Sequence, residues 1–495
     1  MSSEAWLYLS LAALAVWLLA GSGRGGATPG HSAVTSQGLG PVKFAGETWT
    51  PDRLARHVCV IGATGSGKTF STNALLGELM RRGPMVLTCV KPDDCTRVHK
   101  IARDFGCEDR FIRLAPDSGE RMNLVNELLK PNGSVVAAAH MLAKIGEVGS
   151  RYANANVGDN AFWVAQAERA ISAAMVLNLK VEGKADVPLV HRTLLSTPSS
   201  TAELEKPEWK PDAKCERRRC ANLIVRGSGM GLEDEPAFMN ACEYLMHEMG
   251  GGGDRQRGGI IAQANVTLGP FIDPPWNTFF SSDSTIDPER IERERLIVAL
   301  DMPEMTWRQP GQMGQAAITL AVQNYCLRRP FTPGTPITAI VRDEAPRIVT
   351  NDDTEALLVA RSQGLCFIDL LQDVNALRGA FGGDKGKDAA WAFLQNHATT
   401  FIFQTTSLDT VNWVSSVVGQ KLKIRLSGGG TARRHPQGTG DLLDDCLGVG
   451  GDVHWQQSWE PAIRPEWLAQ SPVGVALMLT GGSHRWVDFR SLHRS

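Results

Sequence analysis

The stretch GATGSGKT, Gly62 to Thr69, constrains the fold of this chain more than any other part of the sequence. An apolar run rich in β-branched residues, HVCVI, precedes it, and a helical pattern, FSTNALLGELMRRG, follows it. A glycine-rich loop between a buried strand and a helix start is typical of a phosphate-binding P-loop. Its glycines let successive backbone N–H groups turn towards phosphate oxygens, and the helix adds the positive end of its dipole. We therefore predict an α/β fold in which this loop binds a nucleotide.

Two side chains of the loop have expected roles of their own. Lys68 would reach the β- and γ-phosphates of ATP, and Thr69 would place its hydroxyl group on Mg²⁺. The backbone around them would surround the phosphates. The predicted nucleotide-binding residues are Gly62, Ala63, Thr64, Gly65, Ser66, Gly67, Lys68, Thr69 and Phe70.

The composition bounds the class of protein without deciding its ligand. A chain of 495 residues is too long for one core, and 43% hydrophobic and 21% charged residues are ordinary for a globular protein. The net charge of −2 shows no global basic field, although a protein that threads DNA can keep its basic residues inside a pore. The ten cysteines form no CxxC pair and no zinc-like cluster, which indicates reduced, buried thiols.

The first 24 residues have the pattern of a membrane anchor. Residues 5–20 form an uncharged apolar run, which as a helix would measure about 24 Å against a hydrocarbon core of ~30 Å. Glu4 precedes the run and Arg24 follows it. This charge pattern disfavours a cleaved signal peptide and favours an N-terminus outside with the body in the cytoplasm. Residues 25–41, rich in Gly, Ser, Thr and Pro, are expected to be a linker.

After the linker, strand and helix patterns alternate, then only helices appear, and then the alternation returns. Strands alternating with crossover helices predict a mostly parallel sheet. We therefore expect a nucleotide-binding domain in two parts, 42–126 and 271–495, around an all-α domain at 127–270. Besides the P-loop strand, the expected strands are 85–90, 111–116, 295–303, 336–346, 365–373, 399–406 and one near 476.

Two acids end the predicted strand PITAIVRDEAP. Asp343 and Glu344 would stand at the carboxyl end of the sheet, where open α/β sheets bind their ligands. Asp343 is expected to support Mg²⁺, and Glu344 to polarise the attacking water. Gln372 ends the next strand, so it is expected to contact the γ-phosphate or the same water.

Three further polar residues give weaker signals. Arg361, in VARSQG, could stabilise the transition-state charge in a neighbouring subunit, or it could be a surface arginine near a helix C-terminus. Lys91 follows the second strand and Asn396 precedes a later one. Both could face the crevice, although a solvated lysine and a loop asparagine explain them equally well.

Taken together and in order, several segments resemble the coupling-protein ATPases of type IV secretion and conjugation, the TraG/TraD-like family. They lie between about residues 40 and 425 and read RHVCVIGATGSGKT, VKPDD, RMNLVNELL, IDPERIERERLIVALDMPE, IVRDEAP and ARSQGLCFIDLLQDVNAL.

The resemblance implies a RecA-like P-loop ATPase that assembles as a homo-hexamer on the cytoplasmic face of the bacterial inner membrane. It implies ATP and Mg²⁺ as cofactors. It implies transfer of single-stranded DNA with its relaxase, from the relaxosome towards type IV secretion channel subunits. By position, Lys68 and Thr69 match the Walker A roles, Asp343 and Glu344 the Walker B roles, and Gln372 the γ-phosphate contact.

The chain departs from many relatives in three places. It has one predicted membrane span, it lacks a long carboxyl-terminal tail, and Arg342 stands where an apolar residue often precedes the acids. Without that tail, partner choice is expected to rest on the helical region.

Two other functions stay open. One is an FtsK/HerA-like duplex-DNA translocase, although no winged-helix reader follows residue 425. The other is a receptor for protein effectors with little ATPase activity, against which the intact Lys68, Asp343 and Glu344 argue.

Overall fold

The computed structural model describes residues 41–490 with internal gaps. The gaps are 55, 131, 153–160, 199–202, 204–217, 250–252, 333, 383–385 and 429–452. The predicted membrane anchor and almost all of the predicted linker lie outside the described residues. Across the part that the structure describes, no helix is both long and apolar enough to cross a membrane.

A nine-stranded sheet organises the structure, and the prediction of a mostly parallel α/β sheet is confirmed. The strands from β9 to β5 run parallel to one another, whereas β12 and β13 add an antiparallel edge. In spatial order the strands are β13 (Ser483–Asp488), β12 (Val475–Thr480), β9 (Thr399–Ile402), β3 (Val58–Ile61), β8 (Leu365–Leu371), β7 (Thr338–Arg342), β4 (Met85–Thr88), β6 (Ile297–Leu300) and β5 (Phe111–Leu114).

The two faces of this sheet contribute to two separate hydrophobic cores. Alternate residues of one strand point to opposite faces, so Val58 and Val60 belong to one core while Cys59 and Ile61 belong to the other. Helices α3 (Lys68–Arg82) and α4 (Asp94–Asp104) cover the first face. The second face is covered by α16 (Glu304–Arg328), α17 (Asp352–Ala360), α18 (Val374–Ala380), α19 (Lys387–Gln395) and α20 (Leu408–Val418).

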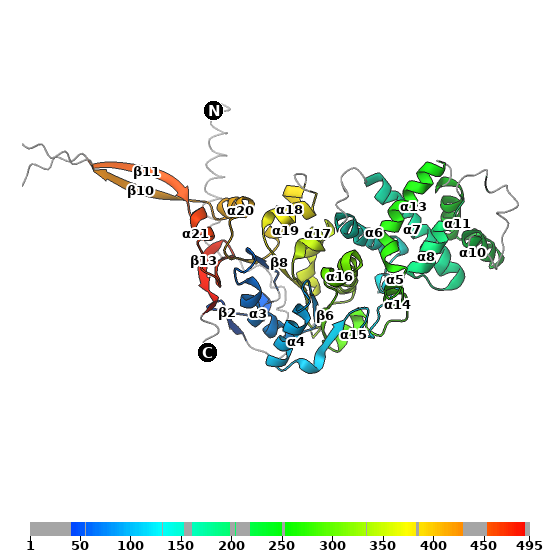
Figure 1. The fold of residues 1–495 in the computed structure, drawn as a ribbon, viewed down its shortest axis with the longest axis horizontal. Helices are drawn as coiled ribbons and strands as arrows, with labels where there is room; N and C mark the ends of the chain where they lie inside the picture. The colour runs from blue at the N-terminus through cyan, green and yellow to red at the C-terminus, as the bar shows by residue number, and fades with distance from the viewer. Residues whose placement is uncertain are drawn as a thin grey trace, which may run out of the picture. The chain divides into compact units, whose positions relative to one another are not determined.

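Between β5 and β6 the described residues form helices and no strand (Figure 1). This helical region shares its core with the second face of the sheet, chiefly through packing of α5 and α6 on α16. Its α-helices are α5 (Leu124–Leu129), α6 (Val135–Tyr152), α7 (Ala161–Glu182), α8 (Val187–Leu195), α10 (Arg219–Gly229), α11 (Pro236–Glu243), α13 (Asp254–Leu268), α14 (Trp276–Ser281) and α15 (Pro288–Arg293).

Two small antiparallel pairs lie outside the main sheet. Strands β1 (Val42–Phe44) and β2 (Glu47–Trp49) pack aromatic side chains into the first core. Strands β10 (Gln420–Gly428) and β11 (Val453–Pro461) pair after α20, where no strand was predicted. Two short helices, α2 (Pro51–Leu54) and α21 (Pro465–Ala469), complete the α-helices of the described chain.

Candidate nucleotide site

The P-loop joins β3 to α3, as the sequence predicts. Its first two residues are tied to the neighbouring strands on both sides. The Gly62 N–H donates to the Leu371 carbonyl at 3.2 Å, and the Ala63 N–H donates to the Gln404 carbonyl at 2.8 Å. The loop therefore starts at the carboxyl edge of the sheet, between the ends of β8 and β9.

The far end of the loop is closed by the carboxyl-terminal part of the chain. Gly67 has φ +96, and a Cβ atom there would lie 2.8 Å from the backbone nitrogen of Gly474. The Gly474 N–H in turn donates to the Ser66 carbonyl at 3.0 Å. A side chain at residue 67 would be strained by its φ angle and blocked by this contact. No local pattern in the sequence indicates this contact, because it joins residues about 400 positions apart.

The loop has the features of an anion cradle. The first bond of α3 runs from the Ser71 N–H to the Gly67 carbonyl, so the amides of Gly67, Lys68 and Thr69 lie before it at the positive end of the helix. The Ser66 hydroxyl is buried and has no hydrogen-bond partner among the described residues. Phosphate oxygens could accept hydrogen bonds from these amides and from the Ser66 hydroxyl.

Lys68 is buried. Among the described residues, its ammonium group bonds only to carbonyls of its own loop, those of Gly62 and, at 3.4 Å, Ala63. Burial lowers the pKa of Lys68, and the charges of Glu344 and Asp343 oppose that shift. The two acids are thus close enough to act electrostatically on the lysine, although they follow a different strand. Lys68 and the two acids follow β3 and β7, whose carboxyl ends lie at the same edge of the sheet.

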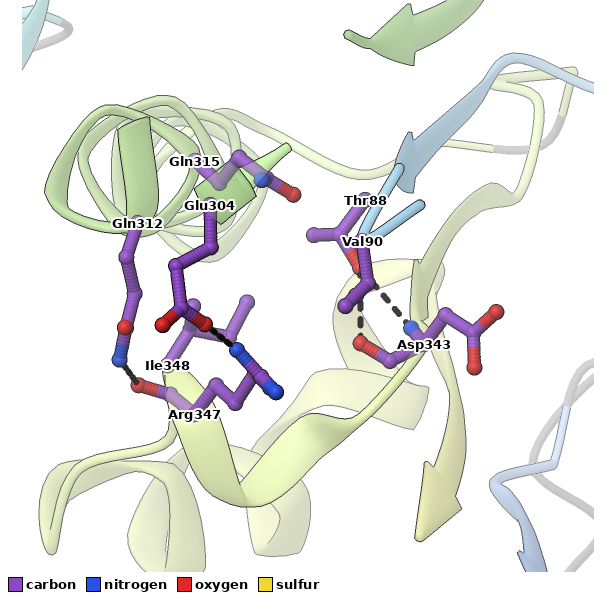
Figure 2. Close-up of a pocket in the computed structure, with 8 residues that line it drawn as sticks. All are labelled: Thr88, Val90, Glu304, Gln312, Gln315, Asp343, Arg347 and Ile348. Carbon is purple, nitrogen blue, oxygen red and sulfur yellow. Dashed lines mark hydrogen bonds and ion pairs between the residues drawn. The ribbon is translucent and has the colours of Figure 1, made fainter. Parts of the chain in front are cut away.

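Asp343 directly follows β7, and its backbone is fixed to the neighbouring strand β4. Its N–H donates to the Thr88 hydroxyl at 2.8 Å, and that hydroxyl donates to the Asp343 carbonyl at 3.3 Å (Figure 2). A cavity of about 10 Å³ lies beside this contact, room for about one water molecule. Figure 2 shows the Asp343 carboxylate turned away from Gln312 and Glu304, which line the other side of that cavity.

The Asp343 carboxylate is largely buried, and its one printed ion pair, with Arg97, is long. Burial raises its pKa to about 6, and the charge of Asp94 adds to that rise. The guanidinium group of Arg97 opposes it from 3.6 Å, a distance too long for a good hydrogen bond. The charge of Lys91, which follows β4, also lowers this pKa.

Glu344 and Gln372 are in direct contact. The Gln372 amide nitrogen donates to Glu344 Oε1 at 2.9 Å. Strand β8, which carries Gln372, lies between β3 and β7, so the glutamine stands between the P-loop and the acids. Glu344 has φ 55, a left-handed conformation that costs a side-chain-bearing residue about 1–3 kcal/mol and is found mostly at functional sites.

Two of the weaker candidates lie elsewhere. Arg361 precedes β8, at the opposite end of that strand from Gln372, and its NH2 group bonds Asp52 at 2.8 Å. A seven-residue strand spans roughly 20 Å, so Arg361 does not reach the cleft of its own chain. Asn396 donates to the carbonyl of Thr354, which is a contact with α17 and not with the crevice.

Sequence reasoning missed Arg97 and Asp94. The Asp94 carboxylate accepts from the N–H groups of Val90 and Lys91, at 3.0 and 2.8 Å, which shapes the loop after β4. Arg97 also bonds Asn73 of α3 at 3.2 Å, so it spans the two helices that flank the cleft. The segment VKPDD after a parallel strand was the available signal, because the carboxyl ends of all parallel strands meet at one edge.

This set of groups suits a nucleoside triphosphate with a divalent cation. The cradle supplies backbone donors and one lysine, and Thr69 and Asp343 supply oxygen ligands of the kind Mg²⁺ prefers. The under-compensated Asp343 carboxylate would gain the positive charge that its surroundings lack. The chemistry to which these groups point is phosphoryl transfer to water.

Comparisons with known proteins bear on the family and the fold of the chain. Residues 338–439 match the family model described as the TraM recognition site of TraD and TraG. In a comparison with curated proteins, no sequence matches the chain.

Among solved structures, the unbound monoclinic form of the bacterial conjugative coupling protein TrwBdeltaN70 is similar with a TM-score of 0.59 and 16% identity, over 92% of this chain and 89% of that chain. The plasmid coupling protein TrwB in complex with ADP and Mg²⁺ gives a TM-score of 0.60 and 15% identity, over 92% and 90%. The chain therefore has the fold of the conjugative coupling protein TrwB, and over residues 338–439 it is TraG/TraD-like in sequence.

Proposed function

We propose that this chain is the ATPase of a conjugation or type IV secretion system, which couples a relaxase-bound single DNA strand to the secretion channel and drives its transfer by ATP hydrolysis. One observation carries the proposal. Lys68, Asp343, Glu344 and Gln372 come from three strands and converge at one edge of the sheet. That convergence is what hydrolysis needs beyond nucleotide binding.

Each residue has a proposed role in the cleft. The amides of residues 62–70 surround the phosphates, and Lys68 leaves its loop carbonyls for the β- and γ-phosphates. Thr69 and Asp343 hold Mg²⁺, which when bound neutralises charge on the phosphate oxygens. Glu344 accepts a proton from the attacking water, and its bond to Gln372 places both side chains beside that water.

The partners are proposed from the comparisons and from the sequence. The match of residues 338–439 to a TraM recognition site supports a relaxosome-related partner, and the similar plasmid coupling protein TrwB has been solved in complex with ADP and Mg²⁺. The apolar run at 5–20 would anchor the body to the cytoplasmic side of the inner membrane.

A homo-hexamer is part of the same proposal. Arg361 is exposed and lies at the far end of β8 from its own cleft, so a neighbour's cleft is the one it would serve. There its guanidinium would stabilise the charge of the transition state.

The test is hydrolysis by the purified full-length chain with single-stranded DNA, with duplex DNA and without DNA. We expect Mg²⁺-dependent ATP hydrolysis that single-stranded DNA stimulates. Lys68→Ala and Glu344→Gln should each abolish it, while Lys100→Ala, at an exposed lysine on α4, should leave it unchanged. Equal rates in Lys68→Ala and the native chain would refute the site.

The same assay separates the alternatives. Stimulation by duplex DNA alone would favour an FtsK/HerA-like translocase. Nucleotide binding with hydrolysis no faster than that of Glu344→Gln would favour a receptor for protein effectors.

A further inference from the structure

Helix α17 begins with two adjacent carboxylates that bind different parts of the molecule. The helix follows the Walker B acids by a short 3-10 turn and leads into β8. Consecutive residues of an α-helix point about 100° apart, so Asp352 and Asp353 reach in different directions from the first turn. The bonding partners of each carboxylate show which parts of the molecule α17 connects.

Asp352 is held by the helical region. His140 Nε2 lies 2.7 Å from Asp352 Oδ2, and Lys144 Nζ lies 3.4 Å from Oδ1. Both partners are on α6, one turn apart. The other nitrogen of His140 is 3.2 Å from Glu168 on α7, so Asp352 joins α17 to α6 directly and to α7 through His140.

Asp353 is held by the strand that leads into the Walker B acids. It bonds the guanidinium group of Arg342, the last residue of β7 and the direct neighbour of Asp343. Arg342 is only 1% exposed, and it also bonds Asp369 of β8 through two nitrogens at 2.6 and 2.9 Å. The arginine that departs from the family pattern is thus a buried brace between α17, β7 and β8.

The middle of α17 is tied to the strand that leads into the P-loop. His57, which directly precedes β3, has Nε2 at 3.0 Å from the Leu357 carbonyl of α17. Its other ring nitrogen accepts the Phe367 N–H at 3.0 Å, so Nε2 carries the proton and donates to α17. One short helix therefore contacts both the strand that leads into the P-loop and the strand that leads into the acids of the nucleotide cleft.

From these contacts, and on the basis of the proposed ATPase function, we propose that α17 transmits conformational changes between the helical region and the nucleotide cleft. Asp352 is its contact to the helical region, and the Asp353–Arg342 pair is its contact to the cleft. A displacement of Asp343 moves Arg342, the adjacent residue of the same strand. Arg342 is close-packed, and three of its nitrogens bond two carboxylates, so it moves α17 instead of swinging aside. Asp352 carries that movement to α6, and DNA or protein bound on the helical region acts on the cleft along the reverse route.

Asp352→Asn tests the contact between α17 and α6 at a position that contributes little to folding. Its side chain is 40% exposed, and exposed ion pairs contribute little to stability. In the full-length chain we expect basal ATP hydrolysis within about twofold of the native rate, and loss of most of the stimulation by a single-stranded oligonucleotide. Glu355→Gln, at an exposed acid three residues further along the helix, is the matched control and should keep both. Native-like stimulation in Asp352→Asn would overturn the proposal.

A double-mutant cycle identifies the contact itself. Lys144→Gln should reduce the stimulation as Asp352→Asn does, and the double variant should lose no more than either single variant, because residues that act through one contact are not additive. Additive losses would contradict a shared route.

A second measurement keeps the inference separate from the ATPase proposal. If the native chain hydrolyses no ATP, the proposed function fails, and hydrogen exchange decides the link. Addition of ADP and Mg²⁺ should slow exchange of α6 amides in the native chain and Glu355→Gln, but not in Asp352→Asn. No change in α6 of the native chain would overturn the transmission route.

Discussion

Asp343 and Asp369 are carboxylates at and within adjacent strands, and their surroundings shift their pKa values in opposite directions. Burial raises the pKa of Asp343 to about 6, although the guanidinium of Arg97, 3.6 Å away, and the charge of Lys91 oppose the rise. Burial would also raise the pKa of Asp369. There the charge of Arg342 and hydrogen bonds from His397 and Arg342 outweigh it, and the pKa falls to about 2.

The difference separates a structural acid from a candidate functional one. Asp369 has partners for both oxygens, with His397 Nε2 at 2.8 Å completing the set. Asp343 lacks such compensation at the point where a divalent cation would sit. Burial alone does not mark a site, whereas burial without a counter-charge does.

The largest expected effect on stability comes from removing the charge of Asp369, the acid whose charge is compensated. Asp369→Asn removes one charge from a fully buried cluster and leaves Arg342 with Asp353 alone. Breaking a buried ion pair on one side costs about 3–5 kcal/mol. Urea unfolding of the purified variant at pH 7 should show a loss of that size. A loss below about 1 kcal/mol would mean that the cluster is not tightly coupled.

Asp343→Asn should move stability the other way. The folded-state pKa of about 6 lies above the ordinary value of 3.8, so the ionised carboxylate destabilises the fold as pH rises between these values. At pH 7 this cost reaches up to about 3 kcal/mol, since each pKa unit corresponds to about 1.36 kcal/mol. In metal-free buffer the variant should be more stable by about 1–3 kcal/mol, and it should hydrolyse ATP more than ~100-fold more slowly.

Asp369→Asn is the matched control for Asp343→Asn, because it makes the same chemical change one strand away. If both variants lost stability equally, the proposed electrostatic difference between the two acids would be wrong. If Asp343→Asn kept native hydrolysis, the carboxylate would have no part in the cleft.

The nucleotide-binding edge could be predicted because its signals are local and share one rule. GATGSGKT with its flanking strand and helix, the acids after TAIV, and Gln372 after CFIDLL each stand at the end of a parallel strand. Parallel strands end at one edge, so three separate segments were expected together, and Gln372 does bond Glu344.

The brace and the edge strand β13 could not be predicted in this way, whereas the neighbouring strand β12 was expected near residue 476. In sequence, Arg342 is a lone charge after an apolar run, and Asp369 is a lone acid inside LCFIDLL. Only the register that places Arg342 opposite Asp369 pairs them. The contact of Gly474 with the P-loop and the β12–β13 hairpin depend on distant parts of the chain in the same way.

A smaller effect follows from His57, the neutral member of the buried region. Burial lowers its pKa to about 4, and the neighbouring His397 adds to that shift. The unfolded chain takes up a proton near pH 6.5 and the folded chain does not, so stability falls as pH drops from 6.5 towards 4. At pH 5 the loss should be about 2 kcal/mol.

His57→Gln should flatten this dependence, measured as unfolding free energy between pH 7.5 and 5. The matched control is His99→Gln, because His99 is about half exposed beside Glu108. An unchanged pH profile in His57→Gln would show that another group titrates, and α17 would then lose one of its proposed anchors to β3.

The smallest expected effect on stability comes from Arg361 and Asp52, an exposed counterpart of the buried Arg342–Asp369 pair. Arg361 and Asp52 form an arginine–aspartate pair at 2.8 Å, as Arg342 and Asp369 do at 2.6 Å, but their side chains are 53% and 38% exposed. Exposed pairs contribute about 0–1 kcal/mol because water screens them. Arg361→Ala should therefore change the unfolding free energy by less than about 1 kcal/mol. A loss comparable to that of Asp369→Asn would assign Arg361 to the fold of its own chain, and the proposal that it serves a neighbour's cleft would lose its basis, because that role needs a side chain free to leave Asp52.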